Sequence, residues 1–220
     1  ATVVLAKASI NVTYNNGMGI GIGTGENTSV TVKGSTINAD DVTGGIGIQI
    51  YGAYNASKDP DKLQEAINDA EGRKYTSLTV EGTKIDAYYS AVMGNGNYHG
   101  SFITIADSEL TSDTTAIYHP QYGNMTLSGN TTVTGGTGIE MRAGTLTIND
   151  DTVSVTATAD FEEQANGNGS TLLGVAIGIS QHNTNAPVNV AVGGGTFTAN
   201  RHFRIRQSRQ GSRGGCKAQS

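Results

Sequence analysis

The sequence has no tryptophan, a single cysteine and only three prolines among its 220 residues. The lone cysteine, Cys216, has no partner for an internal disulfide bond, and no CxxC pair exists to bind a metal ion. So little proline excludes a collagen-like chain or a proline-rich linker, although 31 residues are glycine. We therefore expect backbone pairing and aliphatic packing to stabilise the fold.

The sequence also lacks a long apolar run and an overall positive charge. No segment approaches the about 20 apolar residues that a membrane helix needs, so no membrane span is expected. Residues 1–200 carry 8 Lys or Arg against 19 Asp or Glu, whereas residues 201–220 carry 6 Lys or Arg and no acid. An acidic body repels phosphate, so we expect no nucleic-acid partner.

Apolar residues recur at a regular interval, and this interval determines the predicted fold. Segments such as SLTVEG and TLTIND alternate apolar and polar residues, which predicts strands with every second side chain facing inward. Uninterrupted repeats lie 21 or 22 residues apart. A β-sandwich would show the same alternation but has no reason to repeat at this interval. The aligned first-strand positions are Val30, Leu78, Ile103, Met125, Leu146 and Val190.

Two further strands complete each predicted repeat, and glycine and asparagine between them suit turns with positive φ. The second strand follows the first at an interval of seven or eight residues. Its aligned positions are Ile37, Ile85, Leu110, Val133, Val153 and Phe197, and those of the third strand are Ile48, Val92, Ile117, Ile139 and Ile177. An N-terminal repeat with Val4, Ile10, Ile20 and Ile22 precedes them.

These features predict an all-β fold, a right-handed, single-stranded parallel β-helix (β-solenoid) over residues 1–205. It would contain about seven three-strand coils of 21–22 residues. A helical insertion is expected at about 52–75, where Asp59 is a plausible cap for a short helix, and a polar loop at about 156–173. The composition of residues 206–220 predicts a basic, disordered tail. The alternative is that its positive charges act as an electrostatic clamp.

The repeat length and the segments TLTINDDTV and TGIEMRAGTLTI resemble the right-handed parallel β-helix superfamily. That superfamily contains pectate-lyase-like enzymes, bacterial surface adhesins and phage tailspikes. The resemblance covers about residues 1–205 and concerns architecture alone, because no specific catalytic motif accompanies it. It therefore implies the fold but does not transfer a function.

The third strand carries the residues best suited to bind a ligand. Aligning Ile117 with Ile139 places Tyr118 beside Glu140 on the outward face, with Arg142 close by. A tyrosine ring can stack on a sugar while a charged pair binds hydroxyl groups or a uronate. The alternative is a weak exposed ion pair beside an ordinary surface tyrosine. The predicted ligand-binding residues are Tyr118, His119, Glu140, Arg142 and Gln181, with no catalytic residue, cofactor or metal site assigned.

Other candidate groups give weaker predictions. His119 precedes Pro120 and is interpreted as a corner residue, since no nucleophile or orienting carboxylate lies at a predictable spacing. Asp86, Asp107 and Glu109 are interpreted as solvated acids, because the calcium-binding repeat GGxGxDxUx is missing.

The predicted function is a non-enzymatic extracellular structural or recognition shaft, such as a surface adhesin, filament or phage fibre. Its expected partners are a glycan or surface receptor, or further copies in a homo-oligomer or end-to-end filament, because the end coils of a solenoid expose strand edges. The expected location is extracellular or on the cell or virion surface. The alternative is a polysaccharide lyase or glycoside hydrolase, which clustered acids along the third sheet would favour.

Overall fold

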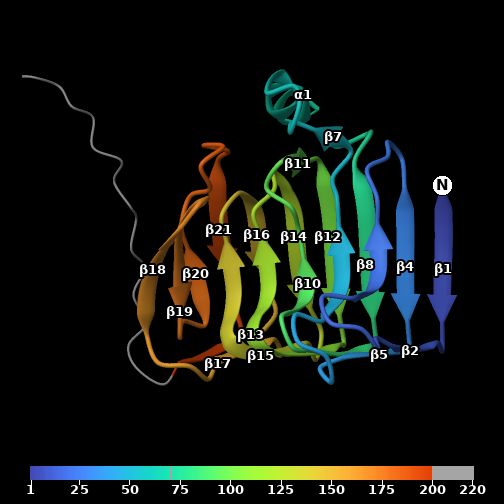
Figure 1. Cartoon of the computed structure of the whole chain (residues 1–220), viewed down its shortest axis with the longest axis vertical. Helices are drawn as coiled ribbons and strands as arrows, with labels where there is room; N and C mark the ends of the chain where they lie inside the picture. Colours follow the sequence, from blue (N-terminus) through green and yellow to red (C-terminus); the bar gives the residue numbers. More distant parts are fainter. Residues whose placement is uncertain (70, 200–220) are drawn as a thin grey trace, which may run out of the picture.

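The computed structural model describes residues 1–69 and 71–199, and most of its regular structure is β-strand. Most strands are parallel and belong to two large stacked sheets (Figure 1). This arrangement confirms the all-β prediction and is compatible with a β-helix. The predicted tail at 206–220 lies outside the described residues.

The first sheet contains the predicted first strand of every repeat. Parallel pairing in register places Val30 beside Leu78 and Leu78 beside Ile103, and the column continues through the remaining aligned positions. Stacking these aliphatic side chains contributes about 25 cal/mol for each Å² of apolar surface removed from water. In spatial order the strands are β1 (Thr2–Ala6), β4 (Ser29–Lys33), β8 (Thr76–Glu81), β12 (Ser101–Ala106), β14 (Gly123–Ser128), β16 (Gly144–Ile148) and β21 (Val188–Val192).

The second sheet has 11 strands and combines the predicted second and third strands. In β13 and β15 these two predicted strands form one continuous strand, and the pairing register shifts between Ser112 and Thr115 where the chain bends. The strands are β2 (Ser9–Asn11), β3 (Met18–Ile22), β5 (Thr36–Ala39), β6 (Ile46–Ile50), β9 (Lys84–Ala87), β10 (Ser90–Met93), β13 (Glu109–His119), β15 (Thr132–Met141), β17 (Ser154–Ala157), β20 (Ile177–Ile179) and β22 (Thr196–Ala199).

Two predicted alignments are wrong by one or two residues, although Val153 itself is buried in the core as expected. Val155, rather than Val153, pairs with Val133, because the turn between β16 and β17 is longer than the corresponding turns in the preceding repeats. In the N-terminal repeat Val4 is 63% exposed, since its neighbour Val3 takes the inward position in the column.

The helical insertion contains α1 (Asp61–Asn68), which lies beside β7 (Tyr54–Asn55) and beyond the ends of the strands of the large sheets (Figure 1). β7 pairs antiparallel with β11 (Tyr98–His99). A small apolar cluster under the helix joins Ala66 to Tyr54 and Tyr75. The N-cap residue is Pro60 rather than the predicted Asp59, whose carboxylate accepts a hydrogen bond from the Asp61 N–H at 3.1 Å one residue earlier in the turn.

The segment predicted as a polar loop contains an antiparallel hairpin, β18 (Glu162–Asn166) and β19 (Gly169–Leu173). Its polar composition gave no sign of strand pairing, because a two-stranded hairpin gains much of its stability from the surface on which it packs. Here β19 contacts β15 and β20 of the second sheet. The hairpin therefore covers part of that sheet's outward face.

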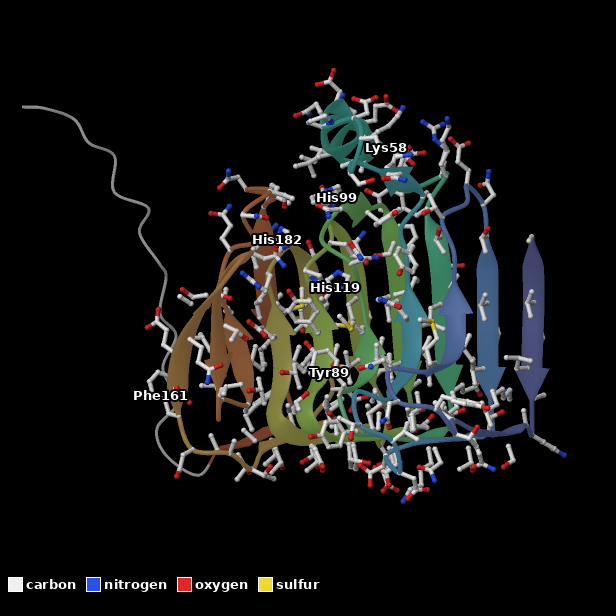
Figure 2. The ribbon with its side chains drawn as sticks, viewed as in Figure 1. Lys58, Tyr89, His99, His119, Phe161 and His182 are labelled. Atoms are coloured by element: carbon white, nitrogen blue, oxygen red, sulfur yellow. The ribbon has the colours of Figure 1, made fainter. Side chains whose placement is uncertain are left out.

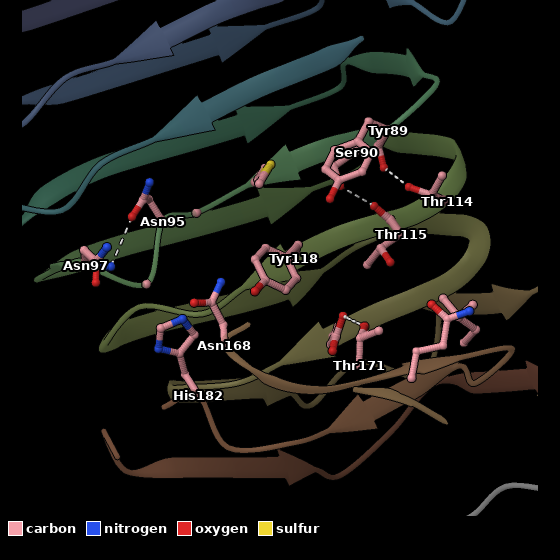
Figure 3. A pocket seen from close by; sticks show the side chains of 16 residues that line it. Tyr89, Ser90, Asn95, Asn97, Thr114, Thr115, Tyr118, Asn168, Thr171 and His182 are labelled. Carbon is pink, nitrogen blue, oxygen red and sulfur yellow. Dashed lines mark hydrogen bonds between the residues drawn. The ribbon is translucent and has the colours of Figure 1, made fainter. Parts of the chain in front are cut away.

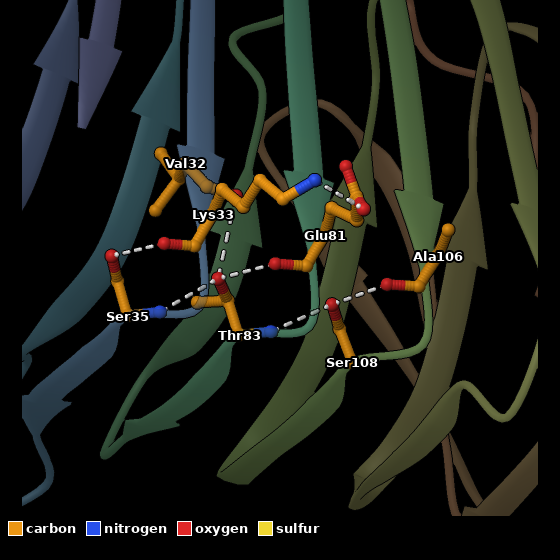
Figure 4. Close-up of polar contacts among 7 residues, drawn as sticks. All are labelled: Val32, Lys33, Ser35, Glu81, Thr83, Ala106 and Ser108. Carbon is orange, nitrogen blue, oxygen red and sulfur yellow. Dashed lines mark hydrogen bonds and ion pairs between the residues drawn. The ribbon is translucent and has the colours of Figure 1, made fainter. Parts of the chain in front are cut away.

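A column of buried hydroxyl groups links the turns between first and second strands (Figure 4). The Ser35 N–H donates to Thr83 Oγ1 at 3.3 Å, and the Thr83 N–H donates to Ser108 Oγ at 3.2 Å. Each hydroxyl donates to the carbonyl two residues before it, at 3.0, 3.0 and 2.7 Å. These bonds satisfy backbone groups that the stacking of repeats removes from water.

Replacing the central hydroxyl tests this column. We expect Thr83→Val to lower the free energy of unfolding by about 1–3 kcal/mol, because the buried Ser35 N–H loses its acceptor. Thr79→Val, on the same repeat but half-exposed on β8, is the matched control and should change it by less than about 0.5 kcal/mol. Urea titration measures both, and equal effects would contradict a stabilising role for the column.

The turn before Thr83 needs a left-handed residue. Gly82 has φ +54°, and no atom lies within 4 Å of the position a Cβ would take. Gly82→Ala should therefore cost about 1 kcal/mol through backbone conformation alone. Gly23 is the control, because it has equally open space without a positive φ, so Gly23→Ala should be neutral or slightly stabilising. Thermal unfolding of both variants measures the difference.

Candidate functional site

A cleft of about 630 Å³ opens on the outward face of the second sheet, where the predicted third strands lie (Figure 3). This volume is within the usual range for small-ligand sites. Tyr118 and Glu140 contribute to the floor from neighbouring strands β13 and β15. One wall is the hairpin with Asn168 and Thr171, and the other is the loop of residues 94–97.

Tyr118 lies half-buried between the two walls, as Figure 3 shows. Its hydroxyl oxygen accepts a hydrogen bond from Arg142 Nη1 at 3.1 Å. Burial raises the pKa of the Tyr118 phenol, and the guanidinium of Arg142 opposes that shift only in part. The side chain therefore stays protonated near neutral pH, so that it can donate a hydrogen bond to a ligand while its ring remains available for stacking.

Glu140 is only 1% exposed, because the hairpin covers it. Its carboxyl group accepts hydrogen bonds from Thr171 Oγ1 at 2.7 Å and from Ser180 Oγ at 3.4 Å. Burial raises the pKa of this carboxyl, while the hydroxyl of Thr171 and the charge of Arg142 oppose the shift. The alternative of an exposed ion pair therefore does not hold for this residue.

Arg142 is fully buried and joins the cleft floor to the hairpin. Its terminal nitrogen Nη1 donates to the Tyr118 hydroxyl, and its terminal nitrogen Nη2 donates to the backbone carbonyl of Asn168. Gly169 has φ +121°, and a Cβ there would lie 2.6 Å from Arg142 Nη2. A glycine at the hairpin turn thus gives the guanidinium the space it occupies.

The other two predicted ligand-binding residues do not line this cleft. His119 points into the core and is 1% exposed. Gln181 is exposed, and its amide donates to the Ala186 carbonyl at 3.3 Å. The cleft instead includes His182, whose Nδ1 lies 3.1 Å from Thr184 Oγ1. Of the predicted residues, Tyr118 and Glu140 line the cleft and Arg142 lies directly behind it.

Sequence reasoning missed the residues of both walls. Asn168 and Thr171 lie in the segment predicted as a loop, and the path of that segment over the sheet has no signature in the repeat. Asn95 and Asn97 lie in the turn after β10 and belong to a different repeat. The one usable signal was the interruption of the repeat itself, since insertions in repeat proteins often form binding surfaces.

Three histidines lie toward the end of the strands nearest α1 (Figure 2). The pKa values of His99, His119 and His182 are each lowered from 6.5 to about 4. Burial is the main cause of each shift. The second cause is the charge of a neighbouring group, which is His182 for His99, His99 for His119 and Arg142 for His182. The three rings are therefore neutral at pH 7.

Within residues 1–69 and 71–199, no three His, Cys, Asp or Glu side chains gather closely enough to hold a metal ion. Among the helices of the same part of the chain, none has the length and apolar character needed to cross a membrane. The described residues that line the cleft include one carboxyl group, that of Glu140, together with amides, hydroxyl groups, two tyrosines and His182. Such a lining suits hydrogen bonding to a polar, uncharged ligand.

Comparison with protein-family models, with curated proteins and with solved structures found no match to this chain.

The buried histidines predict how stability depends on pH. Their folded pKa of about 4 lies below the unfolded value of 6.5, so the unfolded chain binds protons first as the pH falls. The free energy of unfolding should be unaffected by these groups above pH 6.5 and should fall between pH 6.5 and 4. His119→Phe should give a shallower dependence than the wild type in urea titrations, whereas Met125→Leu, a core control, should keep the wild-type slope.

Proposed function

We propose that the protein is a non-enzymatic extracellular shaft that binds carbohydrate in the cleft at Tyr118. The observation that carries this proposal is the tyrosine ring on the floor of a cleft whose walls present neutral hydrogen-bonding groups. A pyranose ring has an apolar face that can stack on an aromatic ring, and hydroxyl groups around its edge. Asn97, Asn168 and Thr171 are spaced around Tyr118 to bind that edge (Figure 3).

We further propose that the shaft is a right-handed parallel β-helix of about seven coils, one for each strand of the first sheet. The right hand follows from the general preference of connections between parallel strands. A shaft of this kind suits display on a cell or virion surface. Its cleft lies on the side of the stack, so added repeats would lengthen the shaft without changing the site.

Only one carboxyl group is found among the described residues of the cleft, which supports binding rather than hydrolysis. Most glycoside hydrolases use two carboxyl groups that flank the scissile bond, about 5–9.5 Å apart. Glu140 has the raised pKa of a general acid, but no second acid is among the described residues that line the cleft. A polysaccharide lyase or hydrolase is therefore the second candidate, and its support is the environment of Glu140.

Binding to a panel of oligosaccharides tests the proposal. Tyr118→Ala should weaken the affinity for any bound sugar by at least about tenfold, which is the loss expected for one stacking contact of about 1.4 kcal/mol. Tyr14→Ala, at a tyrosine that is 81% exposed away from the cleft, is the matched control and should bind as the wild type does.

Isothermal titration calorimetry measures the affinities, and a reducing-sugar assay on the same mixtures detects cleavage. The proposal predicts binding without release of reducing ends. No binding by any sugar would overturn it, and cleavage that depends on Glu140 would establish the enzyme instead.

A further inference from the structure

We infer that the cleft selects neutral sugars over uronates, and that Arg142 is a positioning residue for Tyr118 rather than the cation that receives an acidic sugar. This inference rests on the proposed function. It names the class of sugar that the same site would bind, and it differs from the sequence-based expectation that the charged pair could bind a uronate.

The charges that line the cleft support this selectivity. Among the described residues, the lining contains neither lysine nor arginine, and Glu140 is its one acidic side chain. The carboxylate of a uronate would lose water on entering the cleft without gaining an ion pair, which is costly. An ionised Glu140 repels the carboxylate of the uronate. A protonated Glu140 offers that carboxylate a hydrogen bond but no positive charge to neutralise it.

Arg142 bonds to the floor of the cleft at Tyr118, but its position gives it another role than binding the ligand. It is fully buried, and it does not line the cleft. Its two terminal nitrogens bond to the Tyr118 hydroxyl and to the Asn168 carbonyl, one on the floor and one on the wall. The guanidinium therefore fixes the phenol relative to the hairpin, and a sugar would contact Tyr118 rather than Arg142.

The contact at Tyr118 is available to a hydroxyl group of the sugar. The phenol oxygen already accepts from Arg142 at 3.1 Å, so its own proton is directed to another acceptor. Accepting a hydrogen bond strengthens the same hydroxyl as a donor. A sugar hydroxyl can accept this proton and donate in turn to the side-chain oxygen of Asn168 in the wall.

The experiment compares matched pairs of oligosaccharides that differ only at C6, namely glucose with glucuronate, galactose with galacturonate and mannose with mannuronate oligomers. Isothermal titration calorimetry with the full chain at pH 7 measures each affinity. In the pair that binds, the neutral member should bind at least about tenfold more tightly, equivalent to about 1.4 kcal/mol. The methyl ester of the uronate has no charge and should recover most of that difference.

Three variants separate the two roles. Glu140→Gln should reduce the preference for the neutral member several-fold, since it removes the acid from the floor. Tyr118→Phe keeps the ring but removes the acceptor of Arg142, and Arg142→Lys cannot make both hydrogen bonds. Both should weaken binding of the two members equally, which leaves the ratio unchanged. Circular dichroism confirms that each variant is folded, and Lys33→Ala, far from the cleft, is the control.

The outcomes distinguish the inference from the function on which it rests. A uronate that binds as tightly as its neutral partner, or a selective loss of uronate binding in Arg142→Lys, would overturn the inference while carbohydrate binding stands. If no neutral sugar and no uronate binds, the proposed function fails and the inference fails with it. An unchanged ratio in Glu140→Gln would remove Glu140 as the source of selectivity.

Discussion

The structure depends on parallel backbone pairing between repeats, which places like side chains above one another. Because a strand has a side-chain period of two, one register keeps every inward aliphatic residue in the core, and a shift by one residue would expose them all. Val30, Leu78 and Ile103 show this register in the first sheet. The buried hydroxyl column of Ser35 and Thr83 uses the same repetition at the turns.

The same constraint makes the cleft. Residues one repeat apart on the outward face lie side by side, so Tyr118 and Glu140 are neighbours although 22 positions separate them. A repetitive face alone would leave both exposed to water. The hairpin of β18 and β19 changes their environment, because Thr171 and Asn168 bond to Glu140 and Arg142 and remove both from the surface. An insertion into a regular stack thus produces a specific site.

The sequence was sufficient to predict the strands of the two large sheets and most of their inward columns, because each depends on local alternation repeated at a fixed interval. The exception at Val155 arose where a longer turn changed the spacing, which periodicity alone cannot detect. The neighbours Tyr118 and Glu140 were predictable for the same reason as the columns. Their burial was not, since it depends on how the hairpin packs, and that packing involves contacts such as Thr171 with Glu140 that no repeat encodes.

A crystal structure of the protein soaked with a mixture of neutral oligosaccharides would test the central claim most directly. The account predicts a sugar ring stacked on Tyr118, with its hydroxyl groups bonded to the hairpin and to the opposite loop. A sugar bound at another face of the sheets, with the cleft occupied by solvent alone, would contradict it.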